Sequence, residues 1–192
     1  MSSVLVPLAT GCEELEAVTV IDLLRRAGID VVTASLDGEP VRASRGVTLV
    51  ADTLLDEALR RDFDMVVLPG GAEGARRLGE DDRVTELLRK LADSERFTAA
   101  ICAGPKVLAG AGLLEGRQAT AFPGALDDVP GVELRGGEPV VVDASVVTSR
   151  GPGTAMDFAL RLIELLAGEA QAAEVEQQLQ RPSGHRQYNG AA

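Results

Sequence analysis

A cysteine stands where a strand-like run meets a helical pattern. In FTAAICAGPKVL, residues 97–108, Cys102 ends an apolar stretch and is followed by small residues and a proline. Backbone N–H groups and the dipole at the start of the following helix would favour a thiolate at this point. A reactive nucleophile and a buried structural cysteine both fit the position.

Cysteine nucleophiles usually have a basic partner, most often histidine. The sequence holds one histidine, His185, in a polar C-terminal segment. A Cys–His pair would need that segment to fold back onto the site or to arrive from another subunit. Another group is therefore needed to take or supply the proton of Cys102.

A carboxyl group is the best candidate for that role. The acidic stretch CEELE, residues 12–16, opens a helical pattern. Acidic side chains in a first helical turn favour the helix dipole and are usually solvated, which is what we expect of Glu13 and Glu14. Glu16 lies among apolar neighbours, on or near the inward side. A buried carboxyl tends to stay protonated, and it could donate a hydrogen bond to a thiolate and relay protons.

Two further features lie near the ends of other strand-like runs. In LPGGAEGA, residues 68–75, the backbone N–H groups at Gly70 and Gly71 could hold an anion, although a plain tight turn explains the glycines equally well. The pattern is neither a phosphate-binding loop nor a dinucleotide fingerprint. Cys12, after the first strand-like run, is either a second redox thiol or a packed small residue, and we favour packing.

Composition restricts the class of protein. The 192 residues are 45% hydrophobic and 26% charged, as in a soluble globular protein, and the net charge of −11 disfavours nucleic acid and anionic membranes as partners. No apolar run reaches the roughly 20 residues of a membrane span, and the N-terminus lacks the basic region of a secretory signal. Two cysteines make neither a disulfide framework nor a metal cluster, so we expect a cytoplasmic protein without a metal.

Strand-like and helix-like segments alternate along the chain, which predicts an α/β fold with a mostly parallel sheet. The ligand crevice of such a sheet lies outside the carboxyl ends of the strands. We expect one domain over residues 1–180 and a polar tail over 181–192. The first helix should pack Leu15 and Val18 inward, and the last should start at a capping motif of Thr154 and Asp157 and continue to residue 180. The expected strands are 3–9, 31–36, 64–71, 98–101 and 118–122, with a hairpin at 38–52 and turn-rich β structure at 125–151. Helices before the last one are expected at 13–28, 54–61 and 81–94.

Five ordered stretches together resemble the ThiJ/PfpI superfamily, most closely its Parkinsonism-associated deglycase branch. They are GCEELEAVTVIDLLRRAG, SRGVTL, DMVVLPGG, AAICAGP and TSRGPGTAMDFAL, and the resemblance runs from about residue 3 to 180. It implies a flavodoxin-like sandwich, with a mostly parallel sheet flanked by helices on both faces. It also implies a homodimer.

The resemblance assigns roles to individual residues. The family's reactive cysteine falls on Cys102 and its partner glutamate on Glu16. The backbone donors of the anion pocket fall on Gly71 and Ala103. Three more positions fall in the substrate pocket or at a dimer contact, namely Arg45, Phe122 and Pro152. In dimeric members the arginine that matches Arg45 reaches the partner's pocket.

The activity implied is that of a glyoxalase or protein deglycase that needs neither glutathione nor a cofactor. Its substrates would be methylglyoxal and glyoxal, or their early adducts on proteins. A redox-sensing chaperone that uses the same thiol is the alternative. A peptidase is a third option, but Ala103 stands where the family's peptidases carry histidine, and Phe122 stands where some other members carry one.

Overall fold

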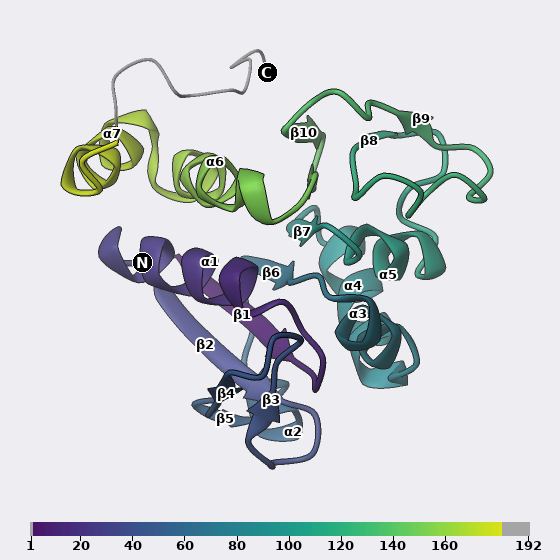
Figure 1. Cartoon of the computed structure of the whole chain (residues 1–192), viewed down its shortest axis with the longest axis horizontal. Coiled ribbons are helices and arrows are strands. Elements are labelled where there is room, and N and C mark those ends of the chain that lie inside the picture. The colour runs from purple at the N-terminus through teal and green to yellow at the C-terminus, as the bar shows by residue number, and fades with distance from the viewer. Residues whose placement is uncertain (1, 182–192) are drawn as a thin grey trace.

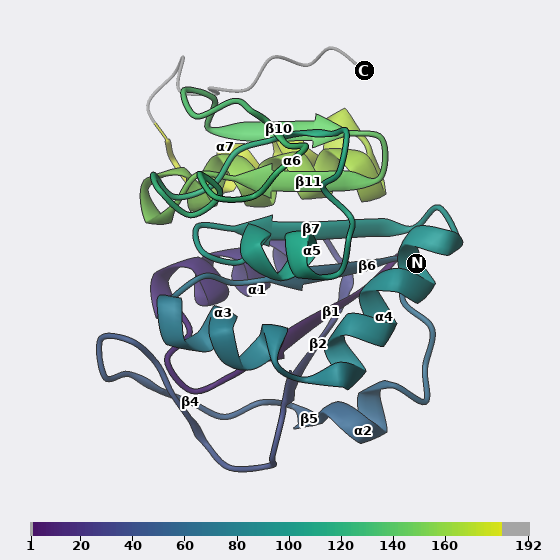
Figure 2. The ribbon, with the colours of Figure 1, turned by 90° about the vertical axis from the view of Figure 1, so that its right-hand side faces the viewer.

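A seven-stranded sheet forms the centre of the molecule. The computed structural model describes residues 2–181, and the strand order of the sheet is β10-β11-β7-β6-β1-β2-β5. Figure 2 shows the strands stacked in this order. Neighbouring strands are parallel throughout, except that β10 runs antiparallel to β11. The strands are β1 (Ser3–Leu8), β2 (Asp30–Ser35), β5 (Thr53–Leu54), β6 (Met65–Leu68), β7 (Phe97–Ile101), β10 (Val140–Asp143) and β11 (Val146–Ser149).

Helices cover both faces of this sheet (Figure 1). One face carries α1 (Glu14–Arg26), α6 (Ala155–Ala167) and α7 (Glu169–Gln178), and the other carries α3 (Ala72–Gly79), α4 (Asp82–Asp93) and α5 (Pro105–Gly110). Each layer buries its own apolar core against the sheet. The strands are buried on both sides, which explains why they read as continuous apolar runs rather than as alternating patterns. The predicted α/β class and the flavodoxin-like layering are confirmed.

The remaining elements are short. β3 (Val41–Arg42) and β4 (Thr48–Leu49) form an antiparallel hairpin, as predicted, and α2 (Leu55–Ala58) follows β5. β8 (Gln118–Ala119) pairs with β9 (Glu133–Leu134) outside the main sheet, so the strand expected over 118–122 is only two residues long. Among the described residues, no helix has the length and apolarity that a membrane crossing needs.

The inward face of α1 differs from the prediction. Leu15 and Val18 are 50% and 46% exposed, whereas Glu16, Ala17 and Val20 are buried. Spacing alone could not choose between two apolar stripes on the same helix, because both have helical periodicity. The stripe that holds a glutamate is the one that faces the core.

The C-terminal region also departs from the prediction. The expected single helix is broken at Gly168, whose φ of 90° lies in the left-handed region, so α6 and α7 are separate. Thr154 makes no side-chain cap to α6, because its hydroxyl bonds Ser149 Oγ and the backbone of Gly151. α3 was not predicted either, because the glycines of residues 68–75 indicate a turn. The predicted polar tail, with His185, lies outside the described residues apart from Arg181.

Candidate functional site

The site lies at the carboxyl ends of three adjacent strands. Strand order reverses beside β1, which has β2 on one side and β6 on the other. In open α/β sheets this switch point is where ligands bind. The loops after β1, β6 and β7 carry Gly11 to Glu13, Gly70 to Gly71, and Cys102, so the three segments singled out in the sequence converge there, as predicted.

Cys102 occupies a strained turn. It is the first residue after β7 and has a φ of 63°, a conformation that few residues other than glycine adopt. Its N–H donates to Ser149 O at 3.0 Å, and its carbonyl accepts from the N–H of Phe122 at 2.9 Å. These bonds on both sides hold the residue in place. Such strain is typical of nucleophiles on sharp strand-to-helix turns, where it exposes the reactive atom.

Two backbone donors point at the sulfur. The N–H groups of Gly71 and Ala103 hydrogen-bond the Cys102 side chain. These are the two residues to which the resemblance assigned the anion pocket. Gly70, next to Gly71, is closely confined, because a Cβ there would lie 2.5 Å from Cys102 Cβ and 2.5 Å from Glu16 Oε2. The glycines thus let backbone, thiol and carboxyl pack together without an intervening side chain.

Glu16 is the second reactive group of the site. Its side chain is fully buried, and Oε2 accepts a hydrogen bond from the Gly70 N–H at 2.7 Å. The other oxygen, Oε1, is buried and has no backbone or polar side-chain donor among residues 2–181. The carboxyl also interacts directly with the Cys102 thiol. A buried oxygen without a donor is costly as an acceptor, so it is well suited to carry a proton.

Burial shapes the titration of both groups. It raises the pKa of Glu16 from 4.5 to about 7, against the lowering effect of the Gly70 N–H and the Cys102 thiol. Burial, followed by the Glu16 charge, raises the pKa of Cys102 from 9.0 to about 12. The lowered thiol pKa expected from a helix start is therefore wrong, because these effects outweigh the N–H groups of Gly71 and Ala103. Because each group affects the pKa of the other, Glu16 and Cys102 titrate as a coupled pair.

Backbone contacts fix the loops around the pair. The N–H of Glu13 donates to Gly70 O at 2.9 Å, which joins the β1 loop to the β6 loop. The N–H of Gly11 donates to Arg42 O and that of Ser44 to Cys12 O, each at 2.8 Å, which joins the β1 loop to the hairpin. Main-chain atoms thus hold the β1 loop, the β6 loop and the hairpin together.

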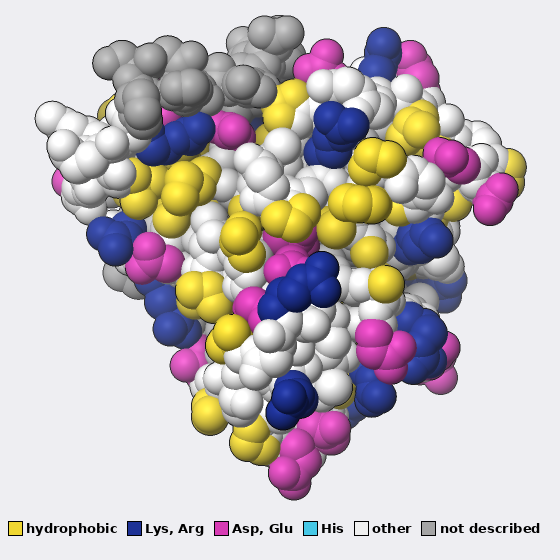
Figure 3. Space-filling model, viewed as in Figure 1, with side chains coloured by type: hydrophobic (Ala, Val, Ile, Leu, Met, Phe, Trp, Pro, Cys, Tyr) yellow, Lys and Arg dark blue, Asp and Glu magenta, His cyan; other side chains and the backbone are white. Residues whose placement is uncertain are grey.

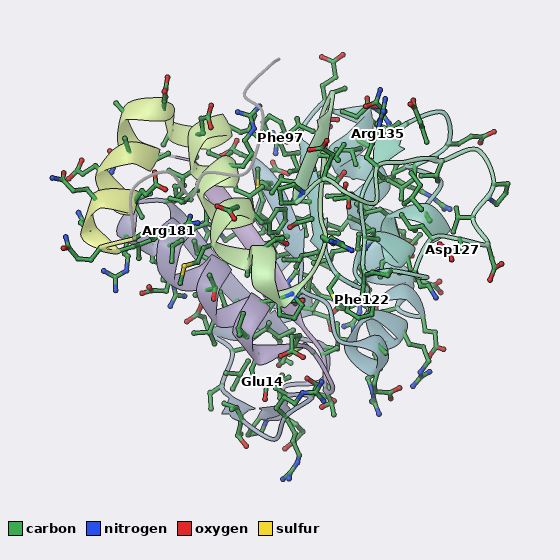
Figure 4. All side chains as sticks on the ribbon, turned by 45° about the horizontal axis from the view of Figure 1, so that its top comes forward. Glu14, Phe97, Phe122, Asp127, Arg135 and Arg181 are labelled. Carbon is green, nitrogen blue, oxygen red and sulfur yellow. The ribbon has the colours of Figure 1, made fainter. Side chains whose placement is uncertain are left out.

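An open cleft of about 1200 Å³ leads to the thiol. Six of the seven predicted site residues line it, namely Arg45, Gly71, Cys102, Ala103, Phe122 and Pro152. Glu16 is the exception, because its side chain is fully buried. Phe122, labelled in Figure 4, is 51% exposed, and its ring lies beside Gly151, just before α6. Arg45 lines the cleft of its own chain.

Sequence analysis missed the role of Glu14, which it expected to be solvated. Glu14 is 9% exposed and accepts hydrogen bonds from the N–H of Arg45 at 2.9 Å, the N–H of Val47 at 3.3 Å and Ser44 Oγ at 3.1 Å. Burial raises the pKa of this carboxyl, but these bonds outweigh burial and lower it. Glu14 therefore anchors the hairpin that forms one wall of the cleft. No pattern in the sequence pairs residue 14 with this hairpin.

Cys12 is packed rather than reactive. It is fully buried in the core beneath α1, and burial raises the pKa of its thiol to about 11. The preference for a packed residue is confirmed. Within residues 2–181, no group of His, Cys, Asp or Glu side chains is arranged to hold a metal ion.

Comparison with known proteins agrees with this geometry. The family model described as the DJ-1/PfpI family matches residues 2–165. DJ-1 homolog B of Arabidopsis thaliana is 45% identical over 177 residues, which span 90% of this chain and 40% of that protein. Drosophila melanogaster DJ-1beta is 44% identical over 90% of this chain and 94% of its own. Its crystal structure superposes with a TM-score of 0.90 and covers 93% of this chain and 98% of that chain. The "Glutathione-independent glyoxalase DJR-1.2" of Caenorhabditis elegans is 35% identical over 81% of this chain and 83% of its own.

Proposed function

The chain belongs to the DJ-1/PfpI family, and we propose that it is a cysteine-dependent glyoxalase or deglycase that acts on small dicarbonyls without a cofactor. The observation that carries the proposal is the close approach of the buried Glu16 carboxyl to the Cys102 side chain, which lines an open cleft: a Cβ on Gly70 would lie 2.5 Å from Glu16 Oε2 and 2.5 Å from Cys102 Cβ. A relative with the name of a glutathione-independent glyoxalase supports the same reaction. Methylglyoxal and glyoxal, free or as early adducts on proteins, are the proposed substrates.

The first step is addition of the thiol to the aldehyde. Transfer of the shared proton to Glu16 removes the carboxylate charge that raises the thiol pKa, and leaves a thiolate facing the N–H groups of Gly71 and Ala103. The sulfur attacks the aldehyde carbon of methylglyoxal, and the C=O bond opens to an alkoxide. Protonated Glu16 supplies the proton to that oxygen, which gives a hemithioacetal. The two N–H groups stabilise the negative charge as it develops.

The second step moves a hydrogen between neighbouring carbons. The Glu16 carboxylate removes the C–H proton of the hemithioacetal carbon and returns it to the adjacent carbon through an enediol, which gives a lactate thioester. Water then attacks the thioester, releases lactate and restores the thiol. The overall reaction adds one water to methylglyoxal, and it consumes no oxidant or reductant.

The test is a turnover assay without glutathione. Purified protein is incubated with methylglyoxal, and dicarbonyl loss and lactate formation are followed for the wild type, Cys102→Ser, Glu16→Gln and Cys12→Ala. We expect many turnovers for the wild type and Cys12→Ala, and loss of lactate formation in the other two. If methylglyoxal modifies Cys102 once and no lactate is formed, the proposal that the protein is an enzyme is refuted.

An oxidation-sensing thiol is the second candidate. The supporting observation is that Cys102 is partly exposed while Cys12 is fully buried, so an oxidant in the cleft meets one thiol. The N–H groups of Gly71 and Ala103 would bond the oxygens of a sulfinate. Titration with peroxide distinguishes the two roles, because a sensor changes its stability or binding on oxidation whereas an enzyme only loses turnover.

A Cys–His peptidase cannot form within residues 2–181, since the sequence has no histidine there.

The proposed partner is a second copy of this chain. Several apolar side chains of α1, of α6 and of the segment around β4 are exposed, namely Leu15, Val18, Met156, Val47 and Val50, with exposures from 45% to 81%. Figure 3 shows hydrophobic side chains gathered over α1 and α6 on this face. Exposed apolar side chains gathered on one face are typical of a protein–protein interface. Light scattering coupled to size exclusion should give the mass of a dimer, and Val18→Glu should convert it to a monomer.

A further inference from the structure

The cleft concentrates the basic side chains that have no partner. Among the residues that the structure describes, Arg42, Arg45, Lys106 and Arg150 are the cations whose side chains form neither an ion pair nor a hydrogen bond. Three of these four, Arg42, Arg45 and Lys106, line the cleft. The whole protein has a net charge of −11, so this local excess of free positive charge is unusual.

The acidic side chains of the cleft offset this positive charge only in part. Glu73 is held by ion pairs to Arg76 at 2.7 Å and to Arg77 at 2.8 Å. Glu13 accepts the hydroxyl of Ser44 at 2.7 Å and has no ion pair. Arg76, which also lines the cleft, is occupied by Glu73 and Glu80. The free positive charge that remains is divided between the hairpin wall and α5.

Lys106 is the cation closest in sequence to the thiol. It lies in the first turn of α5, four residues after Cys102, and its side chain is exposed in the cleft. α5 packs beside α3, and Figure 2 shows α3 between α5 and the segment that carries β4. The sequence has two lysines, Lys90 and Lys106. Lys90 lies on α4, outside the cleft, and forms an ion pair with Asp62. Lys106 is thus a flexible cation with room to reach a bound molecule.

The size of the cleft leaves space for a ligand larger than methylglyoxal. A three-carbon dicarbonyl fills only a small part of about 1200 Å³. Ligand pockets of several hundred Å³ typically bind drug-sized molecules and fix their orientation with a few polar groups. A neutral three-carbon substrate that reacts at the sulfur would leave the three free cations without a partner.

We propose that the cleft selects substrates that carry a carboxylate or phosphate beside the reactive carbonyl, and that Lys106 is the residue that binds this anionic group. The proposal rests on the function proposed above and adds the class of substrate. Arg42 and Arg45 contribute to the positive field from the hairpin. Lys106 acts in binding, because a cation on the wall of the cleft holds the anionic group while the aldehyde meets the thiol.

The first test reads the charge of the cleft without any turnover. Cys102 is alkylated with iodoacetate, which is an anion, and with iodoacetamide, which is neutral and of similar size, and mass spectrometry follows the Cys102 peptide. The ratio of the two rates cancels changes in thiol pKa. We expect Lys106→Gln to lower the ratio of the iodoacetate rate to the iodoacetamide rate about two- to fivefold, in line with the modest strength of a solvent-exposed charge pair. High salt should lower the same ratio by screening the charge.

Lys90→Gln is the matched control. It removes the same charge by the same substitution from α4, outside the cleft, so it should leave the ratio unchanged. Equal ratios for the wild type and Lys106→Gln overturn the proposal, and so does an equal fall in both lysine variants. Because alkylation needs no catalysis, this result holds even if methylglyoxal is not turned over.

The second test uses substrates and separates the two kinds of anion. Turnover of 4-carboxyphenylglyoxal is compared with that of phenylglyoxal, and Lys106→Gln should raise KM for the carboxylated compound alone. Acetate and methyl phosphate are then compared as competitors of iodoacetate alkylation, and the stronger competitor identifies the preferred group. Equal KM effects on both glyoxals, or competition that Lys106→Gln leaves intact, would overturn the assignment of Lys106.

Discussion

Replacing Gly70 with alanine places a methyl group between the thiol and the carboxyl. The new Cβ would lie 2.5 Å from Cys102 Cβ, 2.5 Å from Glu16 Oε2 and 3.0 Å from Ile101 O. Gly70 does not have a positive φ, so alanine fits its backbone and the effect is purely steric. The reacting side chains are therefore the atoms that must move.

The magnitude follows from these distances. Ordinary contacts of a Cβ begin at 3.4 Å, so the thiol or the carboxyl must shift by nearly 1 Å. A misplacement of about 1 Å costs roughly 100-fold in rate, and overpacking of a buried site costs about 1–3 kcal/mol of unfolding free energy. The melting temperature should therefore fall by about 2–4 °C for each kcal/mol lost.

The assay compares Gly70→Ala with Gly110→Ala. Gly110 also lines the cleft, but a Cβ there meets nothing within 4 Å, and alanine is the better helix former in α5. We expect Gly70→Ala to lose about 100-fold in the rate of methylglyoxal turnover and to change the iodoacetamide reactivity of Cys102, while Gly110→Ala keeps both. A folded Gly70→Ala protein with wild-type turnover and alkylation would refute the view that this glycine sets the thiol–carboxyl distance.

Three further predictions concern stability. Folding raises the pKa of Glu16 from 4.5 to about 7, so protonation of this carboxyl stabilises the fold fully below pH 4.5, and the stabilisation is lost as the pH rises through 7. In urea unfolding, the free energy of unfolding of Glu16→Gln relative to the wild type should therefore be about 2–3 kcal/mol more favourable at pH 8 than at pH 5. A difference that does not depend on pH would contradict this. Folding lowers the pKa of Glu14, so the ionised carboxylate stabilises the fold above pH 4.5, and this stabilisation is lost as the pH falls. Glu14→Ala should speed amide hydrogen exchange at Arg45 and Val47 about tenfold or more at pH 7, because their N–H groups lose their acceptor. Unchanged exchange rates at these two amides would refute the anchoring role of Glu14. Gly168 has a φ of 90°, so Gly168→Ala should cost about 1–2 kcal/mol in thermal unfolding, and a neutral result would mean that α6 and α7 can join into one helix.

The order of strands and helices was predictable because each buried strand is a short apolar run bounded by a turn. Cys102 and the glycines after β6 could be placed at the same edge of the sheet by the rule for parallel strands. Glu16 was predicted to face inward because its neighbours in sequence are apolar. Those neighbours did not mark the buried stripe themselves, since Leu15 and Val18 face outward.

Features that depend on tertiary contacts could not be predicted. Glu14 is buried because a hairpin distant in sequence folds over it and donates to it. The thiol pKa is raised because Glu16 and the core surround it, whereas local reasoning considered only the helix start. The break at Gly168 was missed because a single glycine inside a helical pattern is often tolerated.

The main-chain links among the loops at the switch point have a consequence for engineering. Bonds such as Glu13 N–H to Gly70 O and Ser44 N–H to Cys12 O involve no side chain, so substitution of the cleft lining does not break them. A designer could exchange Lys106, Phe122 and Arg45 together, to accept bulkier or differently charged aldehydes, without retuning the alignment of acid and sulfur. Substrate range and reaction chemistry can therefore be varied separately, and a library should leave Cys102, Glu16 and the glycines after β6 untouched.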